Sequence, residues 1–165
     1  LADRAVRLDG LRVLDFGCGT GLLAEHLVVD GVASIDAVDT SPAMLDVLED
    51  KRLRSGWDHV RTSQQLPDAP DGYDLVVCSS VCSFLPDYPG TVAHLVTRLR
   101  AGGVFVQWDW ELDPADDDPH GLGRDAIGDA LRSSGLAGIE VDTAFRVAID
   151  GAEMTPLVGI GSVPG

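Results

Sequence analysis

The stretch VLDFGCGTG, residues 13–21, decides how the rest of the chain is interpreted. An apolar run reaches Asp15, and glycines follow at alternate positions, Gly17, Gly19 and Gly21. Glycine inside regular secondary structure costs about 0.5–1 kcal/mol relative to alanine, so this cluster indicates a backbone that something must approach closely. In open α/β sheets, ligands bind beyond the carboxyl ends of the strands. The stretch therefore predicts a strand, a ligand-binding turn and the start of a helix.

Strand-like and helix-like segments alternate along the chain from this turn onward. Strands are expected at residues 11–16, 34–38, 59–62, 73–80, 104–110 and 139–149 and in the terminal TPLVGIGSV, and helices at 21–29, from 42, at 90–100 and at 122–134. Ser41 is expected to cap the second helix, with Pro42 at its first position, and the AGG at 101–103 to end the third. The alternation predicts an α/β fold: a mostly parallel sheet with helices on both faces and a C-terminal antiparallel hairpin.

Length and charge narrow the class of protein. The chain has 165 residues, 45% of them hydrophobic, which fits one domain. Its formal charge is −15, from 27 acidic and 12 basic residues, and this charge repels nucleic acid and anionic membrane surfaces. No apolar run approaches the roughly 20 residues of a membrane span, and no secretory signal opens the sequence. We expect a cytoplasmic protein whose acidity is a solvated surface, the alternative being a site for cationic substrates.

The cysteines do not indicate a metal site. Cys18, Cys78 and Cys82 form no CxxC pair, and no histidine lies at zinc-finger spacing from them. Cys78 falls in an apolar run and is expected to be a small buried side chain, whereas Cys82 falls in a loop.

The glycine turn differs from the dinucleotide fingerprint. The chain has GxGxG, with Leu22 where GxGxxG would place its third glycine, so a pyrophosphate ligand is disfavoured. Asp39 ends the second strand about 20 residues downstream, where a carboxylate can accept both hydroxyls of a ribose. Asp39 has an alternative role as a helix N-cap, but Ser41 and Thr40 can fill that role. Asp36 is a competing acid that lies within the strand. These features predict a nucleoside ligand.

Three segments resemble a known family. VLDFGCGTG, AVDTSPAML and YDLVVCSS are similar to the first, second and fourth motifs of the class I S-adenosylmethionine-dependent methyltransferases, with a resemblance that covers about residues 8–162. Within this family, the three motifs are most similar to those of small-molecule methyltransferases of the ubiquinone and menaquinone type. The resemblance implies a single methyltransferase-like domain over residues 1–165 with a Rossmann-like, seven-stranded sheet. It also implies S-adenosylmethionine as cofactor and in-line methyl transfer to a small-molecule acceptor.

The resemblance also implies which residues hold the cofactor. Asp39 would bind the ribose, and the glycine turn would surround the methionine part. Family members often carry a Gly-Asp pair after the third strand for the adenine, whereas this chain has Thr62 and Ser63, followed by Gln64, as possible neutral replacements. The implied cofactor-binding residues are Asp15, Gly17, Cys18, Gly19, Gly21, Asp39, Thr40, Met44, Ser63, Gln64 and Ser80.

A general base is needed only for an acceptor that must lose a proton, such as a hydroxyl or a carbon acid. The candidates are acids and a histidine on loops beyond the fourth and fifth strands, namely Asp87, Asp109, Glu111 and His120, with Asp109 and His120 retained as weak catalytic candidates. A solvent-exposed histidine is the competing interpretation of His120. Phe84 and Leu85 are candidates for the acceptor pocket, although packing is the commoner role of an aromatic there.

Alternative functions stay open. Family members usually have helices before the first strand that cap the acceptor site, and only residues 1–10 precede it here, beginning with Leu1 rather than methionine. We therefore expect an N-terminal lid to be missing or truncated. Together with Ser63, this favours one alternative, a catalytically silent S-adenosylmethionine-binding partner subunit. The other, an NAD-dependent oxidoreductase, is disfavoured by Leu22. The acceptor, the atom methylated and the oligomeric state stay open.

Overall fold

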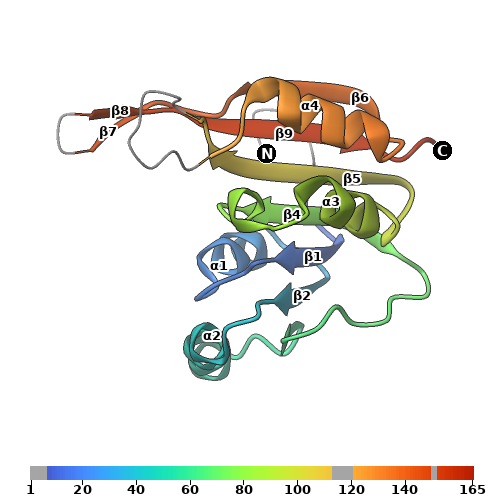
Figure 1. The fold of residues 1–165 in the computed structure, drawn as a ribbon. Coiled ribbons are helices and arrows are strands. Elements are labelled where there is room, and N and C mark those ends of the chain that lie inside the picture. Colours follow the sequence, from blue (N-terminus) through green and yellow to red (C-terminus); the bar gives the residue numbers. More distant parts are fainter. Residues whose placement is uncertain (1–6, 113–120, 150–151) are drawn as a thin grey trace.

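The computed structural model describes residues 7–112, 121–149 and 152–165. Its main feature is a seven-stranded sheet in the order β3-β2-β1-β4-β5-β9-β6 (Figure 1). The strands are β1 (Arg12–Phe16), β2 (Ser34–Val38), β3 (Val60–Ser63), β4 (Tyr73–Ser79), β5 (Leu99–Trp110), β6 (Ala137–Thr143) and β9 (Pro156–Ser162), with β7 (Val147–Ile149) and β8 (Ala152–Met154) in a separate pair. The helices are α1 (Leu22–Val29), α2 (Pro42–Ser55), α3 (Tyr88–Val96) and α4 (Arg124–Ser133), and η2 (Cys82–Phe84) is a 3-10 turn.

The sheet is mostly parallel, as the sequence predicts. β3, β2, β1, β4 and β5 pair in parallel, while β9 lies antiparallel between β5 and β6. Parallel neighbours need a crossover connection, and α1, α2 and α3 supply these connections. The predicted C-terminal hairpin is confirmed, since β6 and β9 pair antiparallel and the short β7–β8 pair lies between them in the sequence.

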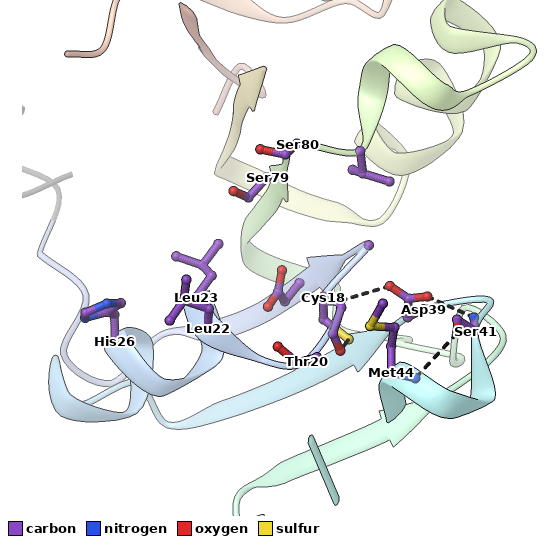
Figure 2. A pocket seen from close by; sticks show the side chains of 14 residues that line it. Cys18, Thr20, Leu22, Leu23, His26, Asp39, Ser41, Met44, Ser79 and Ser80 are labelled. Carbon is purple, nitrogen blue, oxygen red and sulfur yellow. Dashed lines mark hydrogen bonds between the residues drawn. The ribbon is translucent and has the colours of Figure 1, made fainter. Parts of the chain in front are cut away.

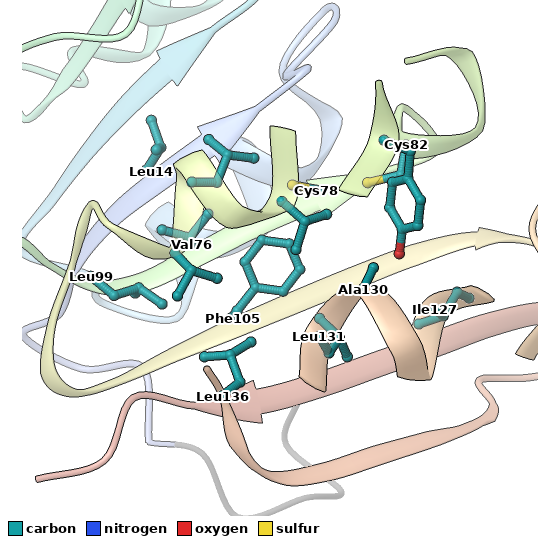
Figure 3. Packing of buried hydrophobic residues seen from close by; sticks show 14 of the residues in the cluster. Leu14, Val76, Cys78, Cys82, Leu99, Phe105, Ile127, Ala130, Leu131 and Leu136 are labelled. Carbon is teal, nitrogen blue, oxygen red and sulfur yellow. The ribbon is translucent and has the colours of Figure 1, made fainter. Parts of the chain in front are cut away.

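Helices cover both faces of the sheet. Successive side chains of a strand point to opposite faces, so the apolar side chains of one strand contribute to two cores. Val13 and Val77 belong to a core shared with α1 and α2, whereas their neighbours Leu14 and Val76 belong to a core shared with α3 and α4. Figure 3 shows the second core, in which Phe105 of β5 lies among side chains of β4, α4 and η2. All of these strand residues are fully buried, so both faces of the central strands are inaccessible to solvent.

Local signals position the second helix correctly. Pro42 is its first residue, and the hydroxyl oxygen of Ser41 accepts a hydrogen bond from the Met44 amide at 3.4 Å. The prediction that Ser41 caps this helix is therefore confirmed.

Several predicted boundaries are wrong. The third helix was expected at 90–100 with a stop at 101–103, but it begins at Tyr88, after an Asp87 side-chain cap, and ends at Val96. Residues 101–103 instead lie within β5, where the pairing with β4 shifts register and Gly102 adopts a φ of 72°. Glycine marks bulges as well as helix ends, and here it permits a bulge. The long strand expected at 139–149 is divided into β6 and β7.

Candidate functional site

The carboxyl ends of β1, β2 and β4 open onto a cavity of about 580 Å³ (Figure 2). These ends meet at one edge because the three strands are parallel, and the volume is within the range of small-molecule sites. The cavity is lined by the glycine turn, the first turns of α1 and α2, and the residues that follow β4. The lining residues are Asp15, Gly17, Cys18, Gly19, Thr20, Leu22, Leu23, His26, Asp39, Ser41, Met44, Ser79, Ser80 and Val81.

The glycines of the turn have different surroundings. Gly17, Gly19 and Gly21 have φ values of 73°, 52° and 80°, in the left-handed region that favours glycine. A Cβ on Gly17 would lie 2.5 Å from Val81, and one on Gly21 would lie 2.2 Å from Leu48. A Cβ on Gly19 would meet no described atom within 4 Å, so Gly19 alone of the three faces open space. The ligand therefore has its closest access to the backbone at Gly19.

Four amides of the turn donate hydrogen bonds within the protein. Gly17 and Cys18 donate to the Val38 carbonyl at 2.8 and 3.0 Å, and Gly21 donates to the Cys18 carbonyl at 2.9 Å. Gly19 donates to the Asp39 carboxylate at 2.8 Å. These amides are therefore not available to a pyrophosphate, which dinucleotide sites bind through backbone N–H groups. This geometry agrees with the absence of the third fingerprint glycine.

Asp39 lies on the cavity wall with capacity to bind a ligand. One of its oxygens accepts from Gly19, and the other accepts from the Ser41 amide at 2.9 Å (Figure 2). A carboxylate has about four acceptor positions, so each oxygen keeps one for a ribose hydroxyl. The competing acid, Asp36, is buried and bound by Arg61 at 2.8 and 3.0 Å and by the Tyr73 hydroxyl at 2.8 Å. Asp39, which directly follows β2, is therefore the acid of this segment that lines the cavity.

Asp15 is a buried acid to which the described residues offer no hydrogen-bond partner. Its exposed fraction is 1%, and neither carboxyl oxygen accepts a hydrogen bond from any group in the described part of the chain. Burial, followed by the nearby charge of Asp39, raises the pKa of Asp15 from 3.8 to about 7. Burial together with Asp15 and Asp39 also raises the pKa of the Cys18 thiol to about 12, so this thiol stays neutral and is a poor nucleophile.

The residues predicted for the adenine end are only partly brought together. Met44 lines the cavity, but Thr40, Ser63 and Gln64 are not among the lining residues. The Gln64 amide donates to the Thr40 carbonyl at 3.2 Å, and the Ser63 hydroxyl donates to the Gln65 carbonyl at 2.7 Å. In this geometry, the polar groups that follow β3 stabilise the local backbone.

Ser80 occupies the carboxyl end of β4 in an uncommon backbone conformation. Its φ is 54°, and it is the one non-glycine residue among those described with a positive φ. Its amide donates to the Trp108 carbonyl of β5 at 2.8 Å, which holds the end of the strand. Backbone strain of this kind occurs often at ligand sites, where the surrounding structure maintains it.

The candidate bases lie away from the cavity wall. Asp109 is 1% exposed, and its carboxylate accepts from the Ser83 amide at 3.0 Å and the Trp110 amide at 3.1 Å, so it positions η2. Glu111 forms an ion pair with Arg124 at 2.9 Å. Asp87 caps α3, as described above, and His120 lies outside the described residues.

Sequence reasoning missed a group on α1. Leu22, Leu23 and His26 line the cavity, and none of them was predicted to bind the cofactor. Leu22 and His26 are four residues apart, and this spacing places them on one helix face directly after the glycine turn. This four-residue spacing was the feature of the sequence that could have placed both side chains at the cavity.

The described ranges contain neither a membrane-spanning helix nor a cluster of metal-binding side chains. No helix there is long and apolar enough to cross a membrane. No group of three or more histidine, cysteine, aspartate or glutamate side chains there is arranged to hold a metal ion.

The strand order and the cavity at the carboxyl ends of β1, β2 and β4 define an α/β domain with a candidate ligand site at one edge of its sheet, and comparison with known proteins gives its family. A methyltransferase domain family matches residues 14–105, and the chain belongs to that family. Its fold is that of the class I S-adenosylmethionine-dependent methyltransferases, and S-adenosylmethionine is the family's cofactor.

Individual relatives agree with this assignment. The chain is 30% identical over 111 residues to a ubiquinone biosynthesis O-methyltransferase of Aeromonas salmonicida, a match that covers 64% of this chain and 46% of the relative. The chain thus spans less than half the length of the curated relatives it matches.

Solved structures share the fold over almost the whole chain. An S-adenosylmethionine-dependent methyltransferase from Mesorhizobium loti superposes with a TM-score of 0.74 at 20% identity, covering 97% of this chain and 94% of that one. Magnesium protoporphyrin IX methyltransferase from Synechocystis PCC 6803, solved with the bound cofactor, gives a TM-score of 0.71 at 20% identity, covering 96% and 73%.

The residues present fit S-adenosylmethionine. Gly19 leaves open space beside the backbone, Asp39 keeps acceptor positions for a ribose, and Asp15 lacks the hydrogen-bond donor that a buried carboxyl requires. The cofactor carries both hydroxyls and cationic groups, which complement these acids.

Proposed function

We propose that this chain binds S-adenosylmethionine in the described cavity and transfers its methyl group in line to a small-molecule acceptor. The observation that carries the proposal is the placement of two acids on one cavity wall, one buried without a partner and one with free acceptor positions. Asp15 suits the cationic methionine part, and Asp39 suits the ribose. We also propose Thr40, Met44, Ser63 and Gln64 for the adenine side.

In this chemistry the protein aligns the acceptor with the cofactor and excludes water from the site. The bound cofactor supplies an activated methyl group, so the acceptor needs correct placement more than it needs a catalytic side chain. Gly17 packs against Val81, which connects the glycine turn to the segment after β4. Asp109 fixes η2 in the same segment through the Ser83 amide. These contacts hold two walls of the cavity at a set separation.

Apolar side chains at the same sheet edge favour an acceptor with an apolar part. Phe84 of η2 is 66% exposed, Leu112 after β5 is 38% exposed, and Phe145 after β6 is 55% exposed. β4, β5 and β6 run in the same direction, so these residues follow strand ends on the cavity's edge of the sheet. The relatives named for ubiquinone biosynthesis agree with this class of acceptor.

The same proposal includes the setting of the enzyme. The free thiols of Cys18, Cys78 and Cys82 suit a reducing, cytoplasmic compartment. A net charge of −15 disfavours a nucleic acid partner.

A second candidate function, cofactor binding without catalysis, has one observation in its favour. The candidate bases Asp87, Asp109 and Glu111 do not line the cavity. An acceptor that must lose its proton would then depend on a partner, or on ionisation before binding.

Calorimetric titration distinguishes these functions. The chain is titrated with S-adenosylmethionine, S-adenosylhomocysteine and NAD, and the series is repeated with Asp39→Ala and with the control Asp46→Ala, an exposed acid of α2 outside the cavity. We expect both sulfur nucleosides to bind, Asp39→Ala to weaken them about 10–100-fold through loss of charged hydrogen bonds, and Asp46→Ala to bind as the unmodified chain does. Binding of NAD alone would overturn the proposal.

A second step tests catalysis. The chain is incubated with radiolabelled S-adenosylmethionine and a small-molecule extract, and transfer of label to an organic-soluble product is measured. Labelled product supports the enzyme. Cofactor binding without any labelled product supports the silent binding subunit.

A further inference from the structure

The cavity has an unusual charge balance around Asp15. This residue comes from β1, beneath the glycine turn, and both of its carboxyl oxygens are buried without a partner in the described structure. The titratable groups that interact electrostatically with it among the described residues are the thiols of Cys18 and Cys78 and the carboxylate of Asp39. None of these groups can supply a positive charge.

The rest of the cavity wall offers Asp15 little positive charge. Among the described lining residues, only His26 can become positive, and its position on α1 is exposed. Two described arginines that follow or belong to neighbouring elements have other partners: Arg61 of β3 binds Asp36, and Arg124 of α4 binds Glu111. A stable negative charge on Asp15 therefore requires a cation from the ligand or from solvent.

We propose that Asp15 is a proton-linked cation site, which holds a proton when the cavity is empty and releases it to solvent as a cationic group of the ligand enters. The inference rests on the proposed function, since the cation is the α-ammonium or sulfonium of the cofactor. The exchange is balanced: the carboxyl loses one proton, the resulting carboxylate pairs with the entering cation, and no covalent bond to the ligand changes.

The direction of the pH dependence follows from burial. Burial and Asp39 raise the pKa of Asp15 to about 7, so the empty site is largely protonated at pH 6 and largely ionised at pH 8. A cationic ligand prefers the ionised form. Its affinity is therefore expected to be about tenfold lower at pH 6 than at pH 8, in proportion to the ionised fraction of Asp15.

Two ligands separate charge from shape. S-adenosylhomocysteine carries the α-ammonium, whereas 5′-methylthioadenosine keeps the adenine and ribose without any positive charge. Both are titrated calorimetrically at pH 6 and pH 8, each in two buffers with different ionisation enthalpies, so that the number of protons released is measured with the affinity.

We expect S-adenosylhomocysteine to release close to one proton at pH 6 and to bind about tenfold more tightly at pH 8. 5′-Methylthioadenosine is expected to release none and to bind equally at both pH values. Asp15→Asn keeps the side-chain shape and should abolish both the proton release and the pH dependence. Thermal melting of Asp15→Asn confirms that the variant is folded.

His26→Gln is the matched control, because His26 is the other described side chain on the cavity wall that exchanges a proton near neutral pH. The control is expected to keep the full proton release. Loss of the proton release in His26→Gln, or its persistence in Asp15→Asn, would overturn the inference. Binding of both ligands without any pH dependence would also overturn it while leaving the proposed function intact, whereas binding of neither ligand at either pH would count against the proposed function itself.

Discussion

Replacement of Asp15 by asparagine should change how the stability of the ligand-free chain depends on pH. Burial raises the pKa of Asp15 from 3.8 to about 7 in the native state, whereas the unfolded chain has the ordinary value. Between these values the native state binds more protons than the unfolded state, so its free energy of unfolding falls as the pH rises. Asparagine cannot ionise, and Asp15→Asn should therefore remove this decrease.

The magnitude follows from the two pKa values. Each pKa unit corresponds to about 1.4 kcal/mol, so the full cost of ionising Asp15 is about 4 kcal/mol, of which roughly 3 kcal/mol develops between pH 5 and pH 8. The buried asparagine amide also lacks partners, which costs about 1–3 kcal/mol at every pH. The variant should be less stable than the unmodified chain at pH 5 and as stable or more stable at pH 8.

Urea unfolding at pH 5, 6, 7 and 8, followed by circular dichroism, measures this difference. The stability of Asp15→Asn minus that of the unmodified chain should rise by roughly 3 kcal/mol across the series. The control is Asp109→Asn, an equally buried acid whose oxygens accept two backbone amides, and it should lose stability at both pH 5 and pH 8. Parallel curves for Asp15→Asn and the unmodified chain would refute the reasoning.

Three further substitutions test other parts of the site and core. Gly19→Ala introduces a Cβ at a φ of 52°, which should cost about 1–2 kcal/mol of stability, and the methyl group should lower the calorimetric affinity for S-adenosylhomocysteine at least tenfold. The control Gly56→Ala, at a φ of 68° and outside the cavity, should lower the stability by a similar amount and leave the affinity unchanged. Ser80→Gly should increase the free energy of unfolding by up to about 1 kcal/mol and so raise the melting temperature, because glycine has no Cβ to clash at a φ of 54°. An unchanged or lower melting temperature would contradict this account of strain. Tyr73→Phe removes the hydroxyl that donates to Asp36 and should cost about 1–2 kcal/mol in urea unfolding, and a neutral effect would mean that the bond adds nothing to the Asp36 ion pair.

The parts of the fold that depend on local sequence were predictable. Ser41 and Pro42 mark the start of α2 with a side-chain cap and a fixed φ, and both effects act within a few residues. The strand at residues 34–38 has the same bounds in the structure as in the prediction, since its apolar run ends at a turn. The glycine turn and Asp39 were identified because their spacing is also local to one strand-helix-strand unit.

The parts that depend on distant contacts were not predictable. Val81 packs against Gly17 and Leu48 against Gly21 across more than one element, so the sequence could not show which glycine faces the cavity. The lack of a partner for Asp15 depends on every element around it. The glycines at 101–103 were assigned to a helix end because the same residue type serves both helix ends and bulges.

The position of β9 has a consequence for protein synthesis. This strand comprises residues 156–162, yet it fills an interior place in the sheet and pairs with both β5 and β6. A nascent chain that stops before residue 156 would leave the long β5 as an open edge, with its main-chain groups available to other chains. β9 must therefore emerge from the ribosome before the sheet can close, and termination before residue 156 should yield aggregation rather than a smaller folded domain.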